Sequence, residues 1–214
     1  MKKVISPAFI LAGALFVLNV QRPPVADKAL ITAPQEVLVA KGDKYKVDVA
    51  ASTVEWTGTK ASGSHTGTIK ITEGTIEVKK DKPLSGNFTL DMTTITDTDL
   101  EGRGKEGLEK HLKGGDFFDV EKNPTATFEI TGFAPIGEKQ NVLLEDANYN
   151  ISGNLTLRGV TKNVTFPASV QVKDKVLTST ADFNIDRTEW GITYGADGKI
   201  AKEIKLKLNI TANK

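Results

Sequence analysis

From Tyr45 almost to the C-terminus, apolar residues recur at every second position in one segment after another. The clearest segment is TATFEI (residues 125–130), in which Ala126, Phe128 and Ile130 alternate with polar residues. This period of two is typical of strands with one buried face. Turns rich in Gly, Asn and Asp recur between the segments, as expected for antiparallel neighbours. The pattern predicts an all-β sandwich or closed barrel.

One helix is expected to interrupt the strands. Leu108 and Leu112 stand four residues apart, and Glu109 and Lys113 have the spacing of a favourable helical ion pair. Gly114 suits the left-handed position that follows many helices. We therefore expect one short helix in a long connection, capping one end of the sheet.

The N-terminus has the features of an export signal. Lys2 and Lys3 precede an apolar run, residues 8–20, that is shorter than the ~20 residues of a membrane-spanning helix. Residues 1–20 are thus predicted to be a secretory signal peptide, with an uncleaved anchor as the alternative because no small-x-small triplet precedes Gln21. Residues 21–44 are expected to form a linker or arm, and residues 45–214 the folded domain of a periplasmic or secreted protein.

Composition excludes several classes of function. The 28 basic and 27 acidic residues give a formal net charge of +1, so we expect no nucleic-acid partner. The absence of Cys excludes disulfides and thiol chemistry. Aromatic residues make up only 7%, too few for the girdles of an outer-membrane barrel, so apart from the N-terminal segment no integral membrane protein is expected. No catalytic motif or metal-spaced His pair stands out, and we predict no catalytic site, metal or cofactor.

Two polar residues fall on apolar faces. Counting by twos from the neighbouring strands places His65 and Arg187 at the ends of inward rows. One interpretation is structural: a hydrogen-bonded His and an Arg in a salt bridge at the barrel rim. The other is functional: both meet the polar head of an apolar ligand, with Trp190 as a flat wall beside Arg187. Glu189 near Arg187 would more readily form an ion pair than act as an acid or base.

The stretch KGGDFFDVEKNPTATFEI, residues 113–130, combines a helix stop, an aromatic pair and a strand. Phe117 and Phe118 are adjacent, so in an extended chain they would point to opposite faces. They either pack in the core or close the end of an apolar cavity.

DFFDVEKNPTATFEI, with GSHTGTIKI, GNLTLRGVTKNVTF and FNIDRTEWGI in the same order, closely resembles the YceI-like family of lipid-binding, lipocalin-like proteins. The resemblance implies an extended lipocalin-like antiparallel β-barrel of about eight strands with one short α-helix in a long connection. It also implies non-catalytic binding, carriage or sequestration of a long-chain apolar lipid in the barrel lumen. The lipid would be a polyisoprenoid, an isoprenoid quinone or a fatty-acid derivative.

Carried onto this sequence, the resemblance and the strand parity predict a set of ligand-binding residues. They are Trp56, His65, Ile69, Phe88, Leu90, Met92, Phe117, Phe118, Phe128, Tyr149, Ile151, Leu155, Phe166, Phe183, Ile185, Arg187 and Trp190. Two alternatives stay open: a solid barrel that acts as a protein-interaction module in the envelope, and a barrel-mouth enzyme that uses Glu189, Arg187 and His65. A homodimer is also an open alternative.

Overall fold

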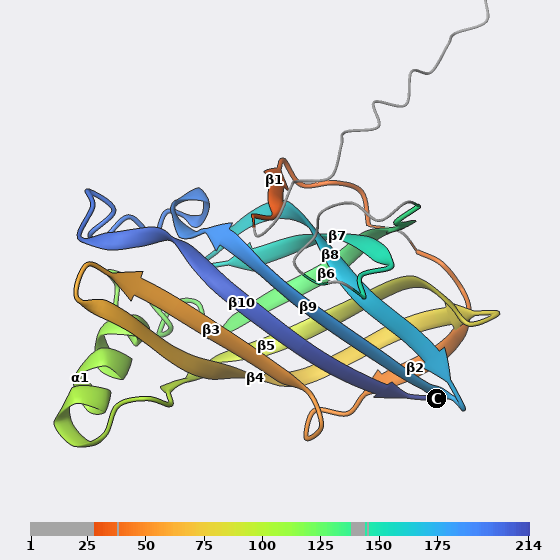
Figure 1. Ribbon diagram of the computed structural model, residues 1–214, viewed down its shortest axis with the longest axis horizontal. Coiled ribbons are helices and arrows are strands. Elements are labelled where there is room, and N and C mark those ends of the chain that lie inside the picture. The colour runs from red at the N-terminus through yellow and green to blue at the C-terminus, as the bar shows by residue number, and fades with distance from the viewer. Residues whose placement is uncertain (1–27, 38, 138–143, 145) are drawn as a thin grey trace, which may run out of the picture.

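Eight long antiparallel strands close into a barrel in the computed structural model, which describes residues 28–37, 39–137, 144 and 146–214 (Figure 1). Each strand pairs with the next along the chain, and the last pairs back with the first. The strands are β3 (Thr53–Lys60), β4 (Gly63–Lys79), β5 (Lys82–Asp97), β6 (Thr125–Pro135), β7 (Tyr149–Leu157), β8 (Val160–Lys173), β9 (Val176–Asp186) and β10 (Ile200–Asn213). The prediction of an all-β, lipocalin-like barrel with one α-helix is confirmed: the described residues form this barrel and contain one α-helix.

The alternation in the sequence becomes alternation between the lumen and the solvent. On β8, Val164, Phe166, Ala168 and Val170 are all buried, whereas the residues between them are partly exposed. Antiparallel partners point to the same side of a sheet, so the register brings inward rows together. Phe88 of β5 thus lies opposite Phe128 of β6.

The predicted linker at residues 21–44 is in part a piece of the barrel wall. Strand β1 (Leu30–Thr32) pairs with β8, where Ile31 lies opposite Val164. Lys28 forms a parallel bridge with Asn184 of β9. The pairing between β8 and β9 ends at Ala168 and Ala181, so β1 covers the seam beyond that point.

A second short strand, β2 (Asp43–Val47), completes the wall beside β3. Tyr45 lies opposite Ile76 in the second half of β4, and Val47 lies opposite Ala212 near the end of β10. Strands β2 and β3 therefore both lie between β4 and β10, next to different parts of those two long strands.

Helix α1 (Gly102–Lys113) lies between β5 and β6 at one end of the barrel, and the C-terminus lies at the other (Figure 1). Leu112 is buried and Leu108 packs against the core, as the predicted stripe requires. Two details differ from expectation. Glu109 pairs with Lys105 at 3.8 Å instead of with Lys113. Gly114 has φ −77°, an extended conformation rather than a left-handed one.

A 3₁₀ turn, η1 (Arg187–Trp190), follows β9. No helix in the described ranges has both the length and the apolar character needed to cross a membrane.

Candidate functional site: a divided apolar lumen

The inside of the barrel contains a cavity of about 130 Å³, which we call the inner cavity. Its wall is apolar except for Ser179. Inward-facing residues of all eight barrel strands supply the wall, namely Val54, Ile71, Ile76, Pro83, Phe88, Leu90, Phe128, Ile130, Phe133, Ile151, Leu155, Val164, Phe166, Val170, Leu177, Ala181, Phe183, Leu206, Leu208 and Ile210. Because a stable water needs two to four polar partners, such a wall favours hydrocarbon over water.

Four phenylalanines run around part of this wall. Phe166 and Phe183 stack with their ring centroids 4.0 Å apart and an interplanar angle of 5°. Phe128 lies 5.9 Å from Phe166 and 6.4 Å from Phe88. Gly153 allows this arrangement, since a Cβ there would lie 2.3 Å from the ring of Phe128.

A second, larger cavity of about 260 Å³ lies toward helix α1, and we call it the helix-side cavity. Its apolar wall includes Met92, Leu112 and Ile185. Unlike the inner cavity, it also has polar side chains in its wall, namely Thr59, Lys60, His65, His111 and Arg187. The interior therefore has one section that is apolar except for Ser179 and one with several polar side chains.

The two cavities share part of their walls. Val54, Leu90, Leu155 and Leu206 border both. These four side chains therefore lie between the inner cavity and the helix-side cavity.

Phe117 and Phe118 are both buried and both border the helix-side cavity. The opposite orientation that an extended chain would give does not arise, because the segment is a turn. The N–H of Phe118 donates to the carbonyl of Leu112, and that of Phe117 donates to Gly114. The pair thus covers the lumen below the end of α1.

Arg187 is almost fully buried, with 1% exposure. Its guanidinium donates to the backbone carbonyls of Ile192 at 2.6 Å, Ala201 at 3.0 Å and Ile200 at 3.2 Å. The expected salt bridge at the rim is therefore replaced by backbone hydrogen bonds. Burial lowers the pKa of the guanidinium, and the charge of Asp186 offsets part of that effect. Arg187 holds the chain after η1 against the barrel, and only its remaining donors are free for a head group.

The two tryptophans have different surroundings. Trp56 borders the helix-side cavity opposite Gly67, where a Cβ would lie 2.4 Å from the indole. Its Nε1–H is buried and has no hydrogen-bond partner among the described residues. Trp190 is fully buried, donates to the carbonyl of Leu155 at 3.1 Å, and lies outside both cavity walls. The expected role of Trp190 as a wall beside the ligand does not match this position.

His65 borders the helix-side cavity, and its Nδ1 lies 3.1 Å from a carboxylate oxygen of Asp99. The second oxygen of Asp99 accepts the N–H of Thr66 at 3.0 Å. Desolvation raises the pKa of Asp99, but the hydrogen bonds from His65 and Thr66 outweigh it, so the pKa lies below its usual value.

Of the other predicted ligand-binding residues, only Tyr149 lies outside both walls; it packs against Phe133 at 6.1 Å. Several wall residues were not predicted from the sequence. Leu108, His111 and Leu112 come from α1, whose apolar stripe was the available signal. Leu206, Leu208 and Ile210 belong to an inward row that the alternation of β10 already marks.

The fold and the cavities define a closed antiparallel barrel with an apolar interior. Residues 45–212 match the YceI-like domain, and the chain belongs to the YceI-like family. A UPF0312 protein of Pseudomonas putida strain W619 is 31% identical over 188 residues, which cover 86% of this chain and 90% of the relative. A UPF0312 protein of Pseudomonas aeruginosa strain PAO1 is 48% identical over 94 residues, 40% of this chain and 44% of that protein.

Solved structures share the fold. BcnA of Burkholderia cenocepacia superposes with a TM-score of 0.64 at 23% identity, covering 78% of this chain and 99% of BcnA. A polyisoprenoid binding domain from Saccharophagus degradans, implicated in plant cell wall breakdown, gives a TM-score of 0.59 at 13% identity, covering 79% of this chain and 97% of that domain.

Proposed function

We propose that this protein binds one long-chain apolar lipid, isoprenoid or acyl, in the barrel lumen and carries or sequesters it unchanged. The observation that carries the proposal is the inner cavity, whose wall is apolar except for Ser179. A ligand chain that enters it leaves water for a hydrocarbon surface, a transfer worth roughly 25 cal/mol per Å² of apolar area.

The two sections of the lumen suit the two parts of such a lipid. The tail would occupy the inner cavity and pass between side chains such as Leu90 and Leu155, which border both cavities. The polar head would remain in the helix-side cavity, whose wall includes Trp56 with its unpaired Nε1–H. A buried donor without a partner is costly, so a ligand that accepts a hydrogen bond from it gains affinity.

The structural comparison supports a polyisoprenoid as the first candidate. The Saccharophagus domain of the same fold is described as polyisoprenoid binding. Because it shares only 13% identity with this chain, its ligand is a guide to the chemical class and not to the chain length.

The partners of the polar groups near the lumen are consistent with binding without catalysis. Glu189 pairs with Lys162 at 3.1 Å, and Arg187 is committed to backbone carbonyls. Neither residue is hydrogen-bonded to His65. The enzyme alternative requires Glu189, Arg187 and His65 to lie within hydrogen-bond reach of one another, so these contacts do not support it. The two cavities likewise favour a hollow barrel over the solid interaction module. From residues 1–20, outside the described residues, we propose that the protein acts after export.

Tryptophan fluorescence provides a direct test, because only Trp56 of the two tryptophans borders a cavity. Delipidated protein is titrated with geranylgeraniol and, separately, with palmitate. We expect a saturable change in emission that persists in Trp190→Phe and disappears in Trp56→Phe. Palmitate binding alone would identify an acyl rather than an isoprenoid ligand.

Calorimetry of the same titrations separates loss of signal from loss of binding. Trp56→Phe should still bind, more weakly, since the inner cavity is intact. Absence of saturable heat and of fluorescence change with both lipids would refute the proposal and favour the interaction module.

A further inference from the structure

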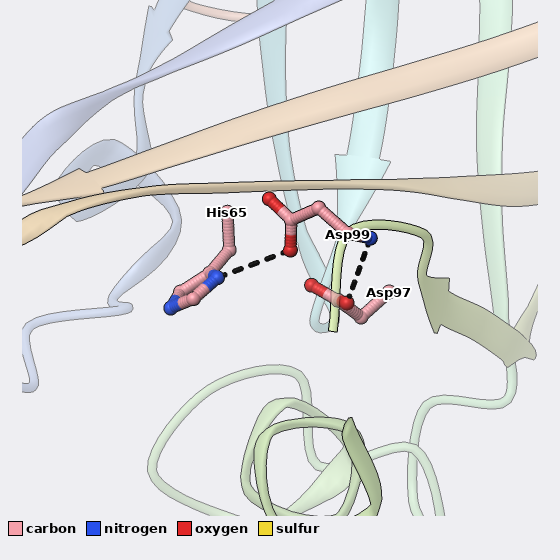
Figure 2. A group of neighbouring side chains, drawn as sticks. All are labelled: His65, Asp97 and Asp99. Carbon is pink, nitrogen blue, oxygen red and sulfur yellow. Dashed lines mark hydrogen bonds and ion pairs between the residues drawn. The ribbon is translucent and has the colours of Figure 1, made fainter. Parts of the chain in front are cut away.

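A cluster of three metal-ligating side chains lies at the α1 end of the barrel (Figure 2). His65 comes from β4, Asp97 is the last residue of β5, and Asp99 lies in the connection to α1. One ligand atom from each lies within 4.8 Å of the other two. The hydrogen bond between His65 and Asp99 joins two of these side chains, and Asp97 is the third.

The backbone holds the three residues in place. Gly67 of β4 lies opposite Asp97 of β5, and the N–H of Thr98 donates to the carbonyl of Thr66 at 2.9 Å. One oxygen of Asp97, Oδ1, accepts the N–H groups of Asp99 at 3.1 Å and Leu100 at 2.6 Å. The cluster thus sits on a fixed turn between a strand and a helix.

The other oxygen of Asp97 has no such role. Asp97 has 0% exposure, and its Oδ2 is buried with no hydrogen-bond partner in the described part of the chain. Figure 2 shows this oxygen directed toward the space between His65 and Asp99. A buried carboxylate oxygen without a partner is unfavourable, so this atom points to a positively charged or donating occupant.

The charges around the cluster point the same way. Glu109 accepts the N–H of Asp97 at 3.0 Å, which adds a third carboxylate nearby. Among the ion pairs of the described residues, no Lys or Arg contacts Asp97 or Asp99; the partner of Asp99 is His65, and Lys105 contacts Glu109. The cluster therefore contains two carboxylates, neither of which is paired with a Lys or Arg of the described residues.

We propose that His65, Asp97 and Asp99 bind a divalent cation, with Zn²⁺ as the best-matched ion. One imidazole and two carboxylates are a ligand set of Zn²⁺. A bound ion at about 2.0–2.2 Å from each ligand draws the three atoms to roughly 3.5 Å of one another. Small rotations of the side chains achieve this, and a tetrahedral ion keeps one position for water.

The site goes beyond lipid binding and does not depend on it. No metal was predicted from the sequence because His65 lies more than thirty positions before Asp97 and Asp99, and the three residues do not form a spaced His pair. Two of them also serve as structural acceptors, so a bound ion would tie the end of β5 to β4.

The test is calorimetric titration of Zn²⁺ into the chain after removal of metals with EDTA. Asp97→Asn and Asp99→Asn keep an oxygen for the backbone N–H groups but lose the charge. The matched control is Asp116→Asn, because Asp116 forms a second His–Asp pair with His111, at 3.2 Å, and has no role in the cluster. Visible absorption of bound Co²⁺ gives a second readout, lost in His65→Gln.

We expect one Zn²⁺ per chain, unchanged affinity in Asp116→Asn, and about 100-fold or greater weakening in the cluster variants, since the loss of even an outer-shell partner costs about 10- to 100-fold. Binding that survives Asp97→Asn and Asp99→Asn would overturn the proposal, as would binding that Asp116→Asn abolishes. Failure of the parent chain to bind Zn²⁺ would also overturn it. If Asp97→Asn does not fold, Asp99→Asn decides.

Discussion

Ala181→Leu should stabilise the lipid-free protein, although core enlargements usually destabilise. Ala181 of β9 is 3% exposed and borders the inner cavity of about 130 Å³. Cavity volume costs about 24 cal/mol per Å³, so filling all of it would recover at most about 3 kcal/mol. The three added carbons give about 2.4 kcal/mol at about 0.8 kcal/mol each.

Ordering the new side chain costs about 0.5–1 kcal/mol, which leaves a gain of about 1–2 kcal/mol. For a chain of this size the gain corresponds to a rise in Tm of roughly 2–8 °C. Differential scanning calorimetry of delipidated protein measures it. The same variant should take up less lipid, because the new side chain occupies space meant for the tail.

Ala212→Leu is the matched control. Ala212 is 0% exposed and borders neither cavity, so added atoms there meet a filled core and should cost about 1–3 kcal/mol. Equal destabilisation by both substitutions would refute the hollow-barrel reasoning.

Three further variants test other parts of the structure. Arg187→Met leaves three backbone carbonyls without their donor. At about 1–3 kcal/mol per buried group, the free energy of unfolding should fall by at least about 3 kcal/mol. A urea-unfolding midpoint equal to that of the parent would contradict this. Gly153→Ala places a Cβ 2.3 Å from the ring of Phe128. The substitution should lower the free energy of unfolding by about 1–3 kcal/mol and weaken lipid binding in the fluorescence titration. Unchanged stability and unchanged lipid affinity would show that the ring has room to move. Hydrogen bonds from Thr96 and from a backbone N–H lower the pKa of Glu109 from 4.5, so its stabilisation is present above pH 4.5 and is lost as the pH falls through the lowered pKa. Urea unfolding across acidic pH should show a smaller loss of stability in Glu109→Gln, and an unchanged pH profile would contradict the assignment.

The alternation of apolar residues was enough to predict an all-β sandwich or barrel and most of its inward rows, and the resemblance to the YceI-like family selected the barrel. Phe88, Phe128 and Phe166 follow from parity alone, since side chains at every second position share a face. Parity does not tell whether the space between the rows is filled, because that depends on the summed volumes of side chains from all strands. The cavities are therefore a finding of the structure.

Local irregularities account for the predictions that were wrong. Phe117 and Phe118 would point to opposite faces only in an extended chain, whereas hydrogen bonds from the end of α1 fold this segment into a turn. Arg187 was expected at a rim with an acidic partner, but its partners are backbone carbonyls, which carry no sequence signal. The seam strand β1 has only three residues, too short for a periodic pattern.

The central claim is that the lumen holds a lipid, and its most direct test is mass spectrometry of the natively purified protein. The chain is expressed without residues 1–20, extracted with solvent and compared with a boiled blank. We predict one long-chain isoprenoid or acyl species per protein chain, and a lower yield from Ala181→Leu. An extract that contains no such species, together with no thermal shift on addition of quinones or polyprenyl phosphates, would contradict the account.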